Sequence, residues 1–151
     1  MIVVSDTSPI NYLILIDQID LLATLFQQII IPQAVYSELS DASAPAPVQT
    51  WIATPSDWLK IQSVNQPSDA IVDLLDPGER EAILLAQELN ANLLLLDDMK
   101  ARRAAIEKEF VVTGILGILD QAATMKLINL PFAIQNLQNT SFWASDSRPP
   151  A

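Results

Sequence analysis

Acidic residues stand at the ends of the short apolar runs of this chain, in an arrangement that could build one carboxylate cluster. Asp6 follows the run Ile2–Val4 after a single serine, and Asp97 and Asp98 directly follow the run Leu93–Leu96. Continuous apolar runs of this length are typical of buried parallel strands. The carboxyl ends of such strands meet at one edge of a sheet, where ligands bind. We therefore expect these carboxylates to share that edge.

Three glutamates extend the pattern. Glu38 lies in the helix expected to leave a second apolar run, Ile29–Ile31, and Glu79 and Glu81 begin the Ala- and Leu-rich helix expected over 79–89. A helix that feeds a parallel strand begins at the carboxyl edge of the sheet. Because both residues flank the apolar stripe of this helix, periodicity does not choose between Glu79 and Glu81.

Such a cluster suits hydrolysis of phosphodiester bonds. Carboxylates packed together repel one another unless a cation joins them, and oxygen ligands of this kind favour Mg²⁺ or Mn²⁺. A bound divalent ion can activate water and stabilise an in-line displacement at phosphorus. Each acid also has a simpler interpretation. Asp6 and the Asp97–Asp98 pair could cap helices, Glu38 could be a solvated helix residue, and glutamates near a helix start favour the helix dipole.

The remaining elements are predicted from apolar periodicity and from proline and glycine signals. Thr7 or Ser8 can cap a helix that Pro9 opens. Strands are expected at 2–4, 29–31, 59–64, 93–96 and 110–112, and helices from Pro9, at 20–26, from Pro32, at 48–54, 79–89, 99–109, 114–125 and 131–138. This alternation predicts an α/β fold, a central parallel β-sheet flanked on both faces by α-helices. We expect a single domain over residues 1–139 and a flexible C-terminal tail over 140–151.

The composition excludes several kinds of site. The chain has no Cys and no His, so disulfides, zinc thiolates, His-ligated metals and His-based triads are ruled out. Eight Lys and Arg against eighteen Asp and Glu give a net charge of −10, which disfavours broad electrostatic binding of nucleic acid. Its apolar runs are too short to span a bilayer and no targeting segment is visible, so we expect a cytoplasmic protein without a membrane partner.

Four segments, read in order, resemble the PIN domain. They are V-S-D-T-S-P at 4–9, I-P-Q-A-V-Y-S-E-L at 31–39, D-P-G-E-R-E-A-I-L-L-A at 76–86 and L-L-L-L-D-D at 93–98. The chain looks most similar to an uncharacterised prokaryotic branch, marked by a G-E-x-E-A helix and a later T-G-x-L-G-x-L segment at 113–119, that is related to VapC-like toxins.

The resemblance implies a metal-dependent endoribonuclease, possible toxin of a toxin–antitoxin pair, with Mg²⁺ or Mn²⁺ as cofactor. Its implied partners are an RNA substrate, an antitoxin protein and a second copy of the chain in a homodimer. The implied catalytic residues are Asp6, Glu38, Glu79, Glu81, Asp97 and Asp98, and the implied metal ligands are Asp6, Glu38, Glu81, Asp97 and Asp98. Many PIN sequences carry Thr-x-Asp at the last of these positions, where this chain has two leucines before its acids.

Two other functional classes can be compared with the nuclease. A catalytically inactive PIN-like module would use the same fold to bind a protein partner. A phosphotransfer domain of the receiver type needs an acidic pair after its first strand and a lysine after a late one, which this chain lacks. Five of the eight basic residues, Arg80, Lys100, Arg102, Arg103 and Lys108, fall between positions 80 and 108, where they could contact RNA phosphates or form a solvated helix face.

Overall fold

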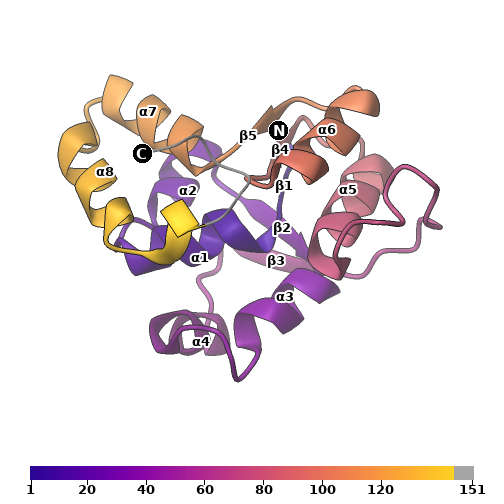
Figure 1. Cartoon of the computed structure of the whole chain (residues 1–151), viewed down its shortest axis with the longest axis horizontal. Helices are drawn as coiled ribbons and strands as arrows, with labels where there is room; N and C mark the ends of the chain where they lie inside the picture. Colours follow the sequence, from indigo (N-terminus) through magenta and orange to yellow (C-terminus); the bar gives the residue numbers. More distant parts are fainter. Residues whose placement is uncertain (145–151) are drawn as a thin grey trace.

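Five short parallel strands form one sheet in the order β3-β2-β1-β4-β5 (Figure 1). In this computed structural model, which describes residues 1–144, the strands are β1 (Val3–Ser5), β2 (Ile29–Pro32), β3 (Leu59–Gln62), β4 (Leu93–Leu95) and β5 (Val112–Thr113). The first strand of the chain is the central one. It pairs with β2 on one side, through Val4 and Ile30, and with β4 on the other, through Val4 and Leu94.

Helices connect the strands and cover both faces of the sheet, which confirms the predicted α/β fold. They are α1 (Thr7–Leu15), α2 (Leu21–Phe26), α3 (Gln33–Ser40), α4 (Ala46–Ala53), α5 (Pro77–Leu89), α6 (Met99–Glu107), α7 (Ile115–Thr124) and α8 (Leu130–Gln138). A 3₁₀ helix, η1 (Ser141–Ala144), follows α8. None of the helices in the described range is long and apolar enough to cross a membrane.

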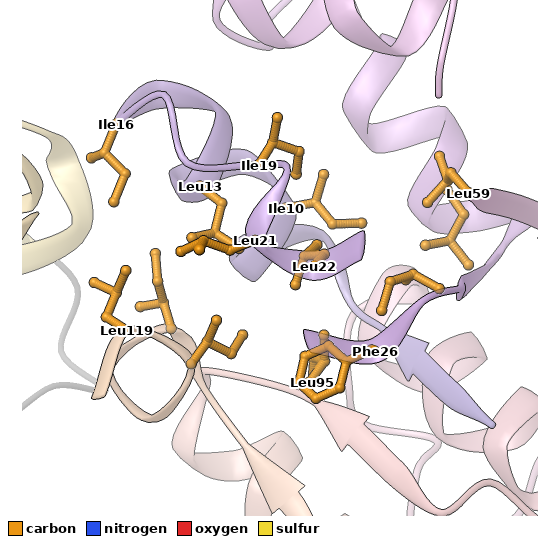
Figure 2. Close-up of a cluster of buried hydrophobic side chains, with 14 of the residues drawn as sticks. Ile10, Leu13, Ile16, Ile19, Leu21, Leu22, Phe26, Leu59, Leu95 and Leu119 are labelled. Carbon is orange, nitrogen blue, oxygen red and sulfur yellow. The ribbon is translucent and has the colours of Figure 1, made fainter. Parts of the chain in front are cut away.

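Alternation along the strands divides the buried side chains between two apolar clusters. Val3 and Leu95 point to one face, where they join the larger cluster with α1, α2 and α7 (Figure 2). Val4 and Leu94 point to the other face, where α5 and α6 cover them. Because both faces are apolar, the strands read as continuous apolar runs rather than as alternating ones.

Several boundaries differ from the sequence-based prediction. Helix α5 begins at Pro77, because Asp76 and Glu79 form a capping box in which each side chain accepts a hydrogen bond from the other residue's backbone N–H. Strand β5 occupies Val112–Thr113 rather than 110–112. Part of the expected flexible tail is also packed, since Phe142 of η1 is buried in the larger cluster. The rest of that tail, 145–151, lies outside the described residues.

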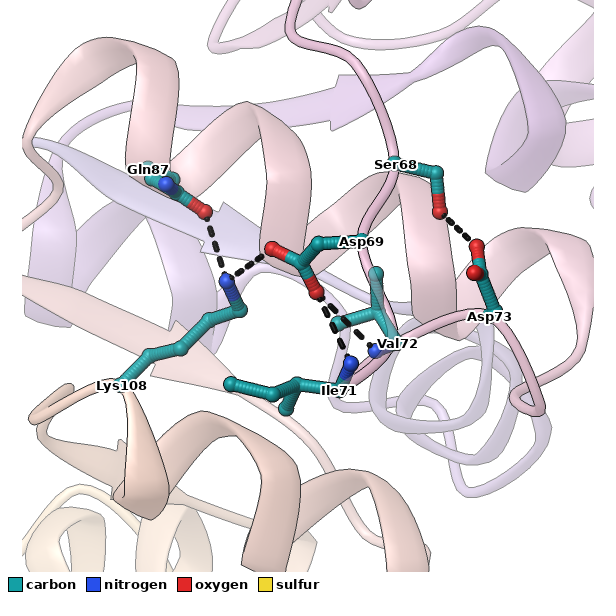
Figure 3. Close-up of polar contacts among 7 residues, drawn as sticks. All are labelled: Ser68, Asp69, Ile71, Val72, Asp73, Gln87 and Lys108. Carbon is teal, nitrogen blue, oxygen red and sulfur yellow. Dashed lines mark hydrogen bonds and ion pairs between the residues drawn. The ribbon is translucent and has the colours of Figure 1, made fainter.

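The long connection between β3 and α5 lacks helix and strand but is anchored to the rest of the domain (Figure 3). The Lys108 ammonium, which follows α6, forms an ion pair with Asp69 at 2.5 Å and donates a hydrogen bond to Gln87 of α5 at 3.0 Å. Glu88 accepts hydrogen bonds from the backbone N–H groups of Asn65 and Gln66. This connection ends at Asp76, the N-cap of α5, so the contacts that anchor it also hold the start of that helix.

Candidate active site

A pocket of about 320 Å³ opens at the carboxyl edge of the sheet. Six acidic residues line it, and they come from segments far apart in the sequence. The lining residues are Asp6, Thr7, Ser8, Asn11, Tyr12, Glu38, Asp76, Glu79, Asp97, Asp98 and Phe142. The expectation that carboxylates from several strand ends share one edge therefore agrees with the position of Asp6, Glu38, Glu79, Asp97 and Asp98.

Asp6 is the most deeply buried acid of the pocket, with 4% of its surface exposed. It follows β1 directly, and its backbone N–H donates to the Leu95 carbonyl of β4 at 3.0 Å. Asp6 occupies the N-cap position of α1, but its side chain makes no capping hydrogen bond. Its Oδ1 atom is buried and has no hydrogen-bond partner. The structure thus separates Asp6 from an ordinary helix cap, because its side chain accepts no capping hydrogen bond from α1.

Glu38 reaches the pocket from α3, and both of its carboxylate oxygens are held. The Thr7 hydroxyl donates to Oε1 at 2.5 Å, and the Gly78 backbone N–H donates to Oε2 at 2.9 Å. Thr7 stands at the start of α1 and Gly78 in the first turn of α5. Glu38 is therefore not a solvated helix residue, because three different helices meet at its carboxylate.

The two adjacent aspartates after β4 have different roles. Asp97 accepts a hydrogen bond from the Ser8 hydroxyl at 3.2 Å and another from the Ile115 backbone N–H, at the start of α7, at 2.9 Å. Asp98 is the N-cap of α6, where its side chain accepts from the Ala101 backbone N–H at 3.1 Å. The capping interpretation thus holds for Asp98. Asp97 instead accepts hydrogen bonds from residues at the starts of α1 and α7.

The structure separates the two glutamates that periodicity left open. Glu79 lines the pocket and takes part in the capping box of α5. Glu81 does not line it. Its side chain accepts a hydrogen bond from the Ala34 backbone N–H at 3.0 Å and so satisfies the start of α3. The metal-ligand prediction that included Glu81 and left out Glu79 therefore disagrees with this geometry.

Burial and mutual repulsion act together on the acids of the pocket. Burial raises the pKa of Asp6 well above its ordinary value, and the charges of Glu79, Asp76 and Glu38 add to this effect, although the Thr7 backbone N–H opposes it. Burial likewise raises the pKa of Glu38, against the hydrogen bond from Thr7. These carboxylates are held in a place that disfavours their charged forms.

The same effect reaches the other walls of the pocket. Burial, reinforced by the charges of Asp76 and Asp98, raises the pKa of Glu79 to about 7. Burial also raises the pKa of Asp97, although hydrogen bonds from Ile115 and Ser8 and the nearby charge of Arg102 oppose the increase. A bound cation would reverse the balance, because it favours ionised carboxylates.

The donor set fits a hard divalent cation by its chemistry. Every acid in the pocket offers oxygen, and the unpartnered Oδ1 of Asp6 is a buried acceptor that a cation would satisfy. Among residues 1–144, however, no three acidic side chains are grouped closely enough to hold one metal ion. Binding of one ion by three of these acids would therefore require the walls that carry them to come closer together than they lie in this structure.

Six lining residues were not identified from the sequence as parts of a site, and two of them, Thr7 and Ser8, were interpreted only as helix caps. Asp76 belongs to a D-x-x-E capping box, a signal that was available in the sequence but indicated only a turn. Asn11 and Tyr12 share a helical face with Ser8, at spacings of three and four residues. Phe142 lies in the segment assigned to a tail and had no local signal.

Three of the five basic residues between positions 80 and 108 contribute to structure. Arg80 and Arg102 donate to the carbonyls of Leu75 and Leu96, and Lys108 holds Asp69. Lys100 and Arg103 are exposed on α6. This distribution leaves two exposed cations on the helix that Asp98 caps.

Comparisons with known proteins agree with this architecture. The family model DUF3368, described as a PIN domain, matches residues 2–148. A solved structure of a PilT N-terminus domain protein from the hyperthermophilic archaeon Sulfolobus solfataricus P2 is similar in fold, with a TM-score of 0.59 and 19% sequence identity over 81% of this chain and 93% of that chain. No curated protein matches the chain.

Proposed function

Because this chain belongs to the PIN domain family, whose members are commonly nucleases, we propose that it is a divalent-metal-dependent endoribonuclease that hydrolyses RNA phosphodiester bonds. The observation that carries the proposal is Asp6. Its carboxylate is buried without a partner for Oδ1, in the wall of a pocket that also gathers Glu38, Glu79 and Asp97. Burying a carboxyl group with one oxygen unpaired costs free energy of folding, and no contact in the described structure compensates for it at Oδ1.

The residues that would hold the metal are Asp6, Glu38 and Asp97, with Asp98 and Glu79 on the same pocket walls. Mg²⁺ or Mn²⁺ supplies Lewis acidity and an activated water when bound. Glu38 and Asp97 are held in fixed directions by hydroxyl and backbone donors. Asp6, buried between strand and helix, keeps its carboxylate out of bulk water.

The acidic protein surface is consistent with this chemistry. With a net charge of −10, the chain would repel RNA over most of its surface. A divalent cation in the pocket would provide positive charge where a phosphate must approach. Lys100 and Arg103, exposed on α6, are further candidates for phosphate contacts.

The finer biological role remains part of the proposal. A toxin–antitoxin pair, an antitoxin protein as partner, a homodimer and a relation to VapC-like toxins are predictions from the family resemblance. An inactive module that binds a protein partner is the alternative function, and the buried Oδ1 of Asp6, which has no hydrogen-bond partner, favours the metal site over it.

The decisive experiment is Mn²⁺-dependent cleavage of a panel of structured RNAs by the wild type and by Asp6→Asn. We expect cleavage by the wild type, none in a chelator, and a loss of about 1,000-fold or more in the variant, the size seen when an essential charge-stabilising group is removed. Asp120→Asn, an exposed aspartate on α7, is the matched control and should cleave normally.

Two results would contradict the proposal. Full activity of Asp6→Asn would mean that the pocket takes no part in the reaction. A folded wild type that neither binds Mn²⁺ nor cleaves any RNA of the panel would favour the inactive protein-binding module.

A further inference from the structure

Two neighbouring hydroxyls at the start of α1 reach two different acids. Thr7 donates to Glu38 and Ser8 donates to Asp97. Consecutive residues of a helix point about 100° apart, so a Thr-Ser pair directly after Asp6 can serve two walls of one pocket. The sequence interpretation of Thr7 or Ser8 as a helix cap is wrong, because the N-cap is Asp6 and both hydroxyls bond outside the helix.

Each of these two acids also receives one backbone donor from the first turn of another helix. The Gly78 N–H of α5 donates to Glu38 Oε2, and the Ile115 N–H of α7 donates to Asp97 Oδ1, both at 2.9 Å. Every oxygen of the two carboxylates therefore has one donor from the protein. A carboxylate oxygen can accept a second interaction, so each keeps a lone pair with its direction fixed.

A glycine stands beside each of the two carboxylates. A Cβ atom at Gly78 would lie 2.6 Å from both oxygens of Glu38, and one at Gly114 would collide with Oδ1 of Asp97. Neither glycine has a positive φ, so backbone conformation does not require it. Both positions are left without a side chain because the carboxylate must approach the helix start closely.

We propose that Thr7 and Ser8 are positioning residues which, together with Gly78 and Gly114, orient Glu38 and Asp97 to bind a divalent cation with Asp6. The inference rests on the proposed function and assigns a task to four residues that bear no charge. Asp6 differs from the two oriented acids, since its Oδ1 has no protein donor. The site thus contains one unpartnered carboxylate and two that protein donors orient on different walls of the pocket, and the three must come closer together to hold one cation.

The alternative is that the hydroxyls only satisfy polar groups. The two explanations differ in a metal-free measurement. If each hydroxyl orients its own acid, Thr7→Val should change the backbone amide proton shift of Gly78 and leave that of Ile115 in place. Ser8→Ala should do the reverse. Thr7→Ser, which keeps the hydroxyl, should restore the wild-type shift of Gly78.

The second measurement is the dissociation constant for Mn²⁺ by titration calorimetry. Groups that orient metal ligands are worth about 10- to 100-fold in metal affinity, so we expect losses of that size in Thr7→Val and Ser8→Ala. Thr7→Ser should bind as the wild type does. Thr124→Val is the matched control, because its hydroxyl bonds only to a carbonyl of its own helix.

Gly78→Ala supplies an independent variant. It should weaken Mn²⁺ binding at least as much as Thr7→Val, and circular dichroism would establish that it is folded. Thr7→Ser keeps the hydroxyl, so its Mn²⁺ affinity should stay at the wild-type value. A purely steric or stability effect of Thr7→Val would not require this result.

The outcomes distinguish this inference from the function on which it rests. If the wild type binds Mn²⁺ and cleaves RNA while Thr7→Val and Ser8→Ala bind equally well, the positioning role is overturned and the nuclease stands. If the amide shifts do not follow the crossed pattern, the positioning role is overturned as well. If the wild type itself binds no Mn²⁺, the proposed function fails and the cation-positioning role falls with it.

Discussion

Helix α1 borders two regions with opposite energetics. Its buried face, with Ile10 and Leu13, packs in the larger apolar cluster. Its other face, with Ser8 and Asn11, lines the acidic pocket. The apolar cluster stabilises the fold by removing hydrocarbon from water. The pocket does the opposite, because burial and repulsion raise the pKa values of the acids in it.

The difference teaches how one small domain combines stability with a strained site. A buried carboxylate without a full set of partners costs free energy of folding, and only the surrounding core can hold it in place. The two regions should therefore respond in opposite directions to mutation, metal and pH.

The largest expected effect on stability is in the apolar cluster. Leu13→Ala removes a side chain that is fully buried, so we expect the free energy of unfolding to fall by about 2–5 kcal/mol. Urea unfolding would measure it. Leu74→Ala is the control, because Leu74 is 90% exposed and its truncation should cost less than about 0.5 kcal/mol. Equal losses in the two variants would mean that the cluster is not the stabilising region.

The second effect is in the pocket and has the opposite sign. Mn²⁺ at about one hundred times its dissociation constant should stabilise the wild type by about 2.7 kcal/mol, which raises Tm by about 5–10 °C for a domain of this size. Asp6→Asn in chelator should melt no lower than the wild type, and it should show no increase in Tm with metal. An unchanged wild-type Tm in millimolar Mn²⁺ would count against a cation site.

The third prediction concerns pH in the absence of metal. The pKa of Glu79 is raised to about 7 in the folded protein, so its protonated form stabilises the fold. This contribution is complete below about pH 4.5 and is lost as the pH rises through 7. Because Glu79 is partly exposed, solvent screening limits the loss to about 1–2 kcal/mol.

Chemical denaturation in chelator between pH 4.5 and 8 would test this slope. Glu79→Gln should flatten the profile, whereas Glu107→Gln, an exposed glutamate of α6, should keep the wild-type profile. A wild type whose stability rises over that range would contradict the assignment.

The smallest effect is expected at the charge pair of Lys108 and Asp69, in which the Asp69 side chain is 39% exposed. The hydrogen bond and charge of Lys108 lower the pKa of Asp69, so the pair stabilises the fold above the ordinary pKa of Asp69 and its contribution is lost as pH falls. Lys108→Met should therefore speed hydrogen exchange over residues 64–76 with little change in Tm, since an ion pair with one exposed partner is screened by solvent and contributes little. A drop in Tm comparable with that of Leu13→Ala would remove the contrast between exposed and buried charges.

The sheet could be predicted because local and global signals agree. Runs such as Leu93–Leu96 are apolar on both faces, and the next residues, Asp97 and Asp98, end them. The predicted bounds of β5 were less accurate, because Phe110 and Val111 continue the apolar pattern before the paired residues begin.

The choice between Glu79 and Glu81 could not be made from periodicity. It depends on the capping box at Asp76, which starts α5 at Pro77 and turns Glu79 toward the pocket. It also depends on Ala34 of α3, which binds the Glu81 carboxylate. The second of these is a contact across 47 positions of the chain, and no local pattern contains it.

The roles of Thr7, Ser8 and Phe142 were out of reach for the same reason. A hydroxyl at a helix start usually bonds locally. Thr7 and Ser8 instead donate to Glu38 and Asp97, which lie far away in the sequence and come close only in the fold. Phe142 follows the last predicted helix, and its burial depends on Tyr12, whose ring it meets edge-on at 5.2 Å.

The central place of β1 has a consequence for how the protein is made. Asp6 is synthesised before every other acid of the pocket, yet Val4 must wait for Leu94 before the strand has its second neighbour. The hydrogen-bond donor that holds Asp97 is later still, at Ile115. The growing chain therefore carries Asp6 without a complete pocket around it until the residues near Ile115 have been added.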